Sequence, residues 1–116
     1  MDKTDDNVSF LSPPNKDNYV TQIQNSSQES GKIDIWVYVY DRMLEYEYTI
    51  PQIMKLFSEG EYTRIEHEKG NLDGIGFTVA FKFAGELEGC HIRGWYDRTT
   101  GFLHLTDMFK CATPIS

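Results

Sequence analysis

One stretch of the chain, GCHIRGWYDRTTGFLHLTD (residues 89–107), concentrates side chains that can do chemistry: a cysteine, two histidines, two arginines, two aspartates and a tryptophan. A thiol beside a histidine can serve as an activated nucleophile, and histidines grouped with carboxylates or thiols can hold a metal ion. Whether either site exists depends on which of these side chains meet, and therefore on how the segment folds.

Apolar and polar residues alternate on both sides of DRTTG (residues 97–101), which predicts two antiparallel strands joined by a turn. A four-residue turn at 98–101 pairs the following residues: Asp97 with Phe102, Trp95 with His104, Arg93 with Thr106, His91 with Met108, Tyr96 with Leu103, Gly94 with Leu105 and Cys90 with Phe109. A turn at Gly85 and Glu86 aligns the preceding strand as follows: Phe81 with Cys90, Val79 with Ile92, Phe77 with Gly94 and Ile75 with Tyr96. Both alignments agree on the core side of the sheet, which a one-residue slip would reverse.

This register separates the reactive side chains. Cys90 points into the core, whereas His91 and His104 point to the opposite side of the sheet. The two histidines lie about 13 Å apart, from a rise of about 3.3 Å per residue plus one strand spacing, and Asp107 has the wrong parity to orient His104. We therefore predict no catalytic residues, no metal ion and no cofactor.

The side of the sheet away from the core remains a candidate binding face. The predicted residues of this alternative site are Tyr62, Arg64, Lys82, His91, Arg93, Trp95 and His104. A solvated face is ordinary for an antiparallel sheet. Tryptophan and arginine are also enriched in binding hot spots, and a curled sheet could instead line a pocket for a small anion, with or without turnover.

A second group of candidates lies in KIDIWVYVYDRMLEYEYTI (residues 32–50), whose alternation predicts a two-stranded hairpin with a tight turn at DRM. One side of this hairpin carries a row of aromatic side chains, and glutamates recur two residues apart in three places. On strands, that spacing places both glutamates of a pair on one face. The predicted partner-binding residues are Trp36, Tyr38, Tyr40, Glu45, Tyr46, Glu47, Glu66 and Glu68.

The remaining segments supply a helix and further strands. In TIPQIMKLFSEG (residues 49–60), Thr49 with Gln52 resembles a capping box and Pro51 falls in the first turn, which predicts a short helix that ends near Gly60. Four strands follow, within residues 61–109. The expected fold class is α+β, an antiparallel sheet built from a two-stranded hairpin, one short helix and a four-stranded meander, and possibly curled into a half-barrel.

Bulk composition narrows the function classes. The chain has 116 residues and a formal net charge of −7, which argues against nucleic acid as a partner because phosphates are neutralised by Lys and Arg. No apolar run is long enough to span a membrane, and the N-terminus lacks the pattern of a signal peptide. The spacing of Cys90 and Cys111 indicates two free thiols. We therefore expect a cytoplasmic protein without a membrane partner. Residues 1–31 have the composition of a flexible or loosely docked polar segment before a single domain, 32–116.

Three functions fit these observations. The leading one is a non-enzymatic binding protein, an acidic inhibitor or immunity-type protein that neutralises a basic toxin or effector. The first alternative is a small-anion pocket on the sheet face. The second alternative is a homo-oligomeric module, for example a homodimer, that associates through the aromatic hairpin.

Overall fold

The computed structural model describes residues 16–29, 31–68 and 70–112. Within them, three helices and five strands follow one another in this order: α2 (Lys16–Ser27), β1 (Ile33–Ile35), α3 (Val37–Tyr46), α4 (Ile50–Glu59), β2 (Glu61–Glu68), β3 (Asn71–Phe81), β4 (Gly89–Asp97) and β5 (Phe102–Cys111). The strands form one mixed, open sheet in the order β1-β5-β4-β3-β2. Only β1 runs parallel to its neighbour, and β2 to β5 form an antiparallel meander.

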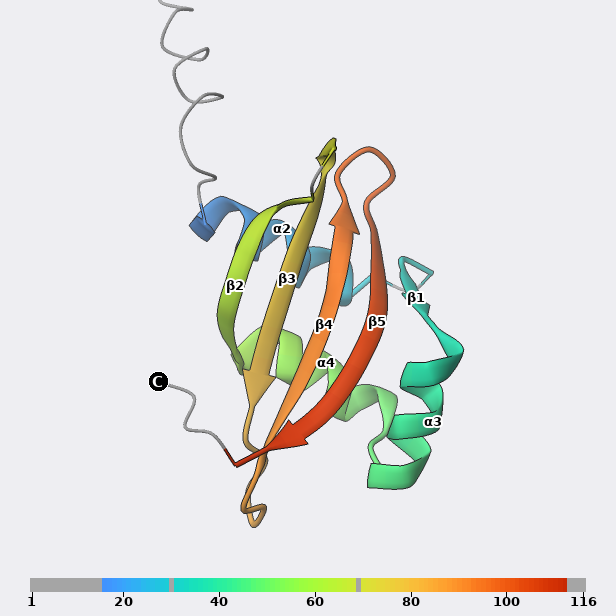
Figure 1. Cartoon of the computed structure of the whole chain (residues 1–116), viewed down its shortest axis with the longest axis vertical. Helices are drawn as coiled ribbons and strands as arrows, with labels where there is room; N and C mark the ends of the chain where they lie inside the picture. The colour runs from blue at the N-terminus through green and yellow to red at the C-terminus, as the bar shows by residue number, and fades with distance from the viewer. Residues whose placement is uncertain (1–15, 30, 69, 113–116) are drawn as a thin grey trace, which may run out of the picture.

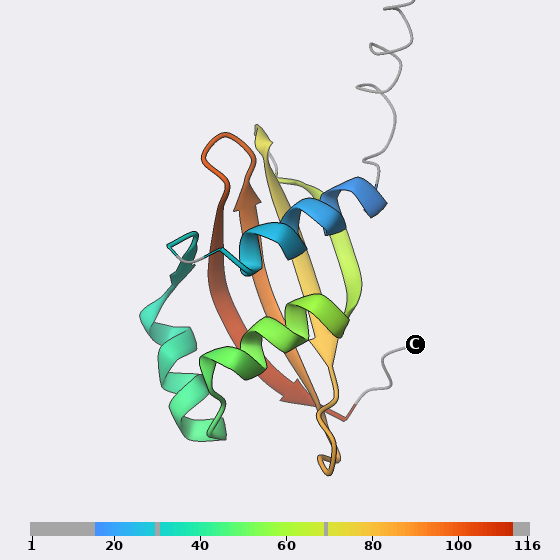
Figure 2. The same cartoon turned by 180° about the vertical axis from the view of Figure 1, so that it is seen from behind.

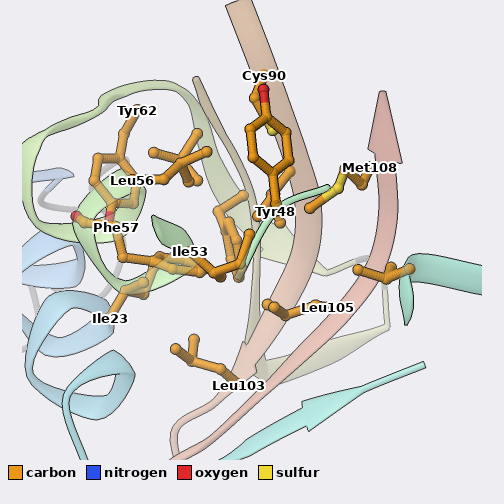
Figure 3. Packing of buried hydrophobic residues seen from close by; sticks show 14 of the residues in the cluster. Ile23, Tyr48, Ile53, Leu56, Phe57, Tyr62, Cys90, Leu103, Leu105 and Met108 are labelled. Atoms are coloured by element: carbon orange, nitrogen blue, oxygen red, sulfur yellow. The ribbon is translucent and has the colours of Figure 1, made fainter. Parts of the chain in front are cut away.

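Helices cover only one face of this sheet. Helices α2 and α4 cross the same face, as Figure 2 shows, and α3 lies beside β5 at the sheet edge (Figures 1 and 2). The core lies between the two covering helices and the inner side chains of the sheet, and Ile23, Ile53, Leu56 and Phe57 enter it from the helices (Figure 3). No described helix or strand covers the opposite face, which we call the open face.

The α+β class, the antiparallel arrangement of the last four strands and the helix at residues 50–59 are confirmed, but the first hairpin and the expectation of a single helix are wrong, because the described residues form three helices. Only Ile33–Ile35 form a strand, and this strand pairs with Leu103–Leu105 in the parallel direction. Val37–Tyr46 form a helix instead. The reason lies in the residue spacing: Val39 and Met43 are four residues apart, so a helix buries both against the core as readily as a strand buries alternate residues.

Helix α4 forms as its sequence predicts. The Thr49 side chain accepts a hydrogen bond from the Gln52 backbone N–H, the Gln52 side chain accepts one from the Thr49 N–H, and Pro51 lies in the first turn. The helix ends before Gly60, and its buried residues are Ile53, Leu56 and Phe57. Capping and amphipathic spacing therefore agree on one structure.

The predicted strand register is confirmed between β3 and β4 and half correct between β4 and β5. Trp95 pairs with His104 as expected, but a bulge then shifts the register, so that Arg93 pairs with Asp107 and His91 with Phe109. A Cβ atom at Gly94 would lie 2.1 Å from the His104 carbonyl oxygen. The close approach of β5 to β4 beside the bulge therefore requires glycine at this position, and a Cβ atom would also lie 3.1 Å from Phe77 Cζ.

Helix α2 lies in the polar segment 1–31, of which residues 16–29 and 31 are described; residues 1–15 and 30 lie outside the described residues. Its Ile23 is fully buried in the core, and Tyr19 and Val20 pack against that core. The Tyr19 ring meets the His67 ring edge-on, with 5.7 Å between centroids. Of the described helices, none combines the length and hydropathy that crossing a membrane requires.

Candidate protein-binding surface

Exposed apolar side chains gather at α3. Seven large hydrophobic residues are exposed in the described chain, and five of them lie between Trp36 and Leu44. Val37 and Leu44 leave 75% and 78% of their surface in solvent, and Trp36, Tyr38 and Tyr40 leave about half. Scattered exposed apolar residues are normal, but a contiguous group of them marks an interaction surface.

The geometry of the helix explains this exposure. Val39 and Met43 are buried and hold α3 against the edge of the domain. Val37, Tyr40 and Leu44 lie at positions i, i+3 and i+7, which places them along one side of the helix, away from the buried pair. We call these three residues the α3 stripe.

Carboxylates border the α3 stripe. Asp41 and Glu45 are exposed on α3, and Glu47 follows its last turn. Arg42 donates hydrogen bonds to the Tyr38 hydroxyl and, at 3.0 Å, to the Glu45 carboxylate, and these bonds raise its pKa above the ordinary value. Within the described chain, the carboxylates of Asp41 and Glu47 have no hydrogen bond or ion pair. The surface around α3 is therefore apolar along its centre and acidic around it.

Both ends of α3 lack the residues that helix ends favour. Trp36 occupies the N-cap position and makes no side-chain capping bond. At the other end Glu47 adopts a left-handed conformation with φ of 62°, where glycine is the usual residue. The backbone N–H groups of Glu47 and Tyr48 nevertheless donate to the Leu44 and Met43 carbonyls.

Asp34 joins the α3 surface to the open face. Its Oδ2 accepts a hydrogen bond from Trp36 Nε1 at 3.3 Å and lies 2.9 Å from His104 Nδ1. The His104 ring stacks on Trp95, with 4.2 Å between ring centroids. The sequence interpretation missed Asp34, although its alternation with Ile33 and Ile35 was the available signal that it faces away from the core.

The residues of the predicted sheet-face site are only partly brought together. Arg64, His91, Arg93, Trp95 and His104 lie on strand positions that alternate with core residues and face the open side. The other two predicted residues, Tyr62 and Lys82, do not belong to this site.

Tyr62 is buried on the helix-covered face, where its hydroxyl donates to the Phe57 carbonyl at 2.7 Å. Burial raises its pKa above the ordinary value. Lys82 follows the last residue of β3 and lies in the loop that leads to β4. The bulge next to Thr63 on β2 and the early end of β3 explain why simple alternation misplaced both residues.

Most of the described cations on the open face have close neighbours of their own. The Arg93 guanidinium lies over the Phe109 ring, and the bulge sets Asp107 opposite this arginine. Arg64 pairs with the Glu66 carboxylate. His91 stacks on Phe109, and burial together with the nearby Arg93 charge lowers its pKa. His104 lies beside the Asp34 carboxylate. Each of these basic side chains therefore has an acidic or aromatic neighbour.

The predicted partner-binding set is divided between two edges of the sheet. Trp36, Tyr38, Tyr40, Glu45, Tyr46 and Glu47 lie on or beside α3, next to β5. Glu66 and Glu68 lie on β2, at the opposite edge of the sheet. The structure therefore does not bring all eight residues into one surface.

Tyr46 and Tyr48 are not part of an exposed aromatic row. Tyr48 is buried, and its hydroxyl donates to Glu86 Oε1 at 2.6 Å. Lys110 Nζ lies 3.4 Å from the same carboxylate oxygen and 5.5 Å from the centroid of the half-buried Tyr46 ring. These contacts attach the α3–α4 junction to the β3–β4 loop, so both tyrosines serve packing.

Cys90 is a core thiol. It is fully buried, and burial raises its pKa to about 12, so the nucleophilic thiolate does not form near neutral pH. His91 and His104 lie on the other face, which leaves this thiol without a histidine base. Among the described residues, no three His, Cys, Asp or Glu side chains gather as metal ligands would.

Known proteins give no direct analogy for this surface. No protein-family model, curated protein or solved structure matches the chain.

Proposed function

We propose that this chain is a non-enzymatic protein-binding domain that docks a basic protein on the α3 surface, defined as the α3 stripe with Trp36, Tyr38 and the bordering carboxylates. The observation that carries the proposal is the concentration of exposed apolar side chains between Trp36 and Leu44 on a helix anchored by Val39 and Met43. An anchored helix presents these side chains in fixed positions, which reduces the entropy lost on binding.

The energetics favour a protein partner. Burying an exposed Val or Leu side chain contributes about 1.5 to 3 kcal/mol, so Val37 and Leu44 together offer several kcal/mol that the isolated chain does not use. Trp36 and Tyr38 add the aromatic side chains that recur in binding hot spots. An apolar centre with a polar border is the usual anatomy of a protein interface.

Charge supports a basic partner. The net charge of −7 would attract a cationic protein over long distances and speed its association. Asp41 and Glu47, whose carboxylates have no partner in the described chain, would meet cations at the border of the interface. A small acidic inhibitor or immunity-type protein that neutralises a basic toxin or effector would use a surface of this kind.

The two alternatives have less support. A small-anion pocket requires converging cations, but Lys82 lies in a loop and His104 has Asp34 as its neighbour. Self-association through α3 would bring the carboxylates of two copies together, because a two-fold contact repeats the same surface on both sides. The acidic border therefore disfavours a second copy.

A capture experiment with the full chain tests the proposal. Tagged wild type, Leu44→Lys and Leu87→Lys would each be incubated with extract of the source cells at low salt, and bound proteins identified and weighed by native mass spectrometry. Leu87 is 90% exposed in the β3–β4 loop, so its replacement is a matched control. We expect one basic protein, bound stoichiometrically by wild type and Leu87→Lys and lost from Leu44→Lys. Equal capture by all three chains would contradict the proposal.

A further inference from the structure

We infer that the partner lays a basic amphipathic α-helix along α3, with its apolar residues on the α3 stripe and its cations at the C-terminal end of α3. This inference rests on the proposed function and specifies the partner's shape and charge.

The shape follows from the stripe. The α3 stripe is a ridge of side chains along one side of the helix, formed by Val37, Tyr40 and Leu44. A second helix packs against ridges of side chains that are spaced three and four residues apart. A strand would need unpaired backbone N–H and C=O groups, but a helix bonds these groups internally. The α3 stripe therefore suits a helix better than an added strand.

The charge follows from where the carboxylates lie. The C-terminal end of a helix carries a partial negative charge, which makes nearby anions unfavourable and nearby cations favourable. Glu45 lies in the last turn of α3 and Glu47 follows it, and the last turn contains no basic residue. Arg42 pairs with Glu45, whereas the Glu47 carboxylate has no partner in the described chain. This end of α3 thus combines the negative end of the helix dipole with one carboxylate, that of Glu47, which has no partner in the described chain. A partner Lys or Arg side chain beside Glu47 would replace an unfavourable arrangement by a favourable one.

The same charges select against a second copy. In an antiparallel pair of α3 helices, the Asp41 carboxylates of both copies would approach each other beside the stripe. A basic helix has the opposite effect, because its cations would flank its apolar residues. The occupant is therefore a helix of different charge and not this chain.

A displayed library of helical peptides, selected against the full-length protein, tests the inference. Leu44→Lys serves for counter-selection, and peptides that pass are measured by fluorescence anisotropy. We expect enriched peptides that are net basic and carry apolar residues at i, i+3 or i+4, and i+7. Scrambling their order at constant composition, or replacing Leu44 by Lys, should each lower the affinity at least about tenfold.

Matched protein variants separate the apolar and the charged contributions. Glu47→Gln should weaken these peptides by about threefold or more, with the difference shrinking as salt rises. Glu59→Gln, which removes an exposed carboxylate from α4, and Leu87→Lys should leave the affinity unchanged.

Three results would overturn the inference: no enrichment of Leu44-dependent peptides, enrichment of neutral or acidic sequences, or equal binding of scrambled peptides. If cell extract yields a Leu44-dependent protein while the helix library yields nothing, the inference fails and the proposed function stands. If the capture experiment fails as well, the proposed function fails with it.

Discussion

Helices α3 and α4 are adjacent in sequence and equal in length, yet they differ in how they are capped and in how many of their apolar residues are buried. Each has ten residues. Helix α4 begins with a capping box and buries Ile53, Leu56 and Phe57, so that it serves the core. Helix α3 has no side-chain cap, ends on Glu47 in a left-handed conformation, and leaves Val37 and Leu44 in solvent.

The comparison of α4 with α3 distinguishes residues that stabilise the fold from residues whose presence the stability of the fold does not explain. In α4 the capping box and the buried residues Ile53, Leu56 and Phe57 stabilise the isolated domain, and exceptions are confined to the helix ends, where Ile50 is 43% exposed and Glu59 lies in the last turn. In α3 the buried Val39 and Met43 and the half-buried Tyr46 do so, whereas its exposed apolar residues and C-terminal glutamates add nothing or cost stability. Departures from local rules are expected where a surface serves binding.

The largest contrast should appear in core substitutions. Phe57→Ala in α4 removes a fully buried ring and should lower the free energy of unfolding by about 3 to 5 kcal/mol. Leu44→Ala in α3 should change it by less than about 0.5 kcal/mol, because the side chain is exposed. Urea titrations with a constant m-value would measure both. A cost above about 2 kcal/mol for Leu44→Ala would show that the stripe is buried and remove the basis of the proposed surface.

Hydrogen exchange should distinguish the helices without any substitution. Backbone amides in the middle of α4, which packs on the sheet beside α2, should exchange only on global unfolding. Amides of α3, which lies at the sheet edge, should exchange at least about tenfold faster, a difference of about 1.4 kcal/mol in opening free energy. Equal protection would mean that α3 belongs to the same cooperative unit as α4.

The N-terminal cap gives a smaller effect. Thr49→Ala removes the capping box of α4 and should cost about 1 kcal/mol in urea titrations. Thr99→Ala is a suitable control because Thr99 is exposed in the β4–β5 turn. Its hydrogen bond to Asp97 Oδ1 is donated by the backbone N–H, so the substitution keeps it. If both threonines cost the same, the capping box contributes nothing beyond threonine itself.

The smallest effect has the opposite sign. Glu47→Gly relieves the left-handed backbone and removes a carboxylate from the negative end of α3, so it should raise the free energy of unfolding by about 0.5 to 1 kcal/mol. The same replacement two residues earlier, Glu45→Gly, lies within the helix and should lower it by about 0.5 to 1 kcal/mol. A thermal or urea melt that gives both variants the same sign would exclude backbone strain at Glu47.

The sequence predicted much of the sheet and little of the candidate surface. Strand positions in β2 to β5, the β3–β4 register and the burial of Cys90 followed from alternation, and α4 followed from Thr49, Gln52 and Pro51. The aromatic residues at 36, 38 and 40 were predicted as partner-binding and are exposed, but at the N-cap and in the first turn of a helix instead of on a hairpin. That secondary structure could not be predicted, because β-branched and aromatic residues favour strands while Val39 and Met43 fit a helix equally well.

By itself, the sequence determined those features whose signals lie within a few residues of each other, namely the capping box and the alternation of the meander, together with the acidic composition. The tertiary structure decided the rest. Residues 37–46 form a helix that packs beside β5 at the edge of the sheet. The bulge near Gly94 places Asp107 opposite Arg93, and the parallel pairing of β1 with β5 places Asp34 beside His104. Strand order and bulges depend on contacts between residues far apart in the chain, and local residue preferences are too weak to specify them.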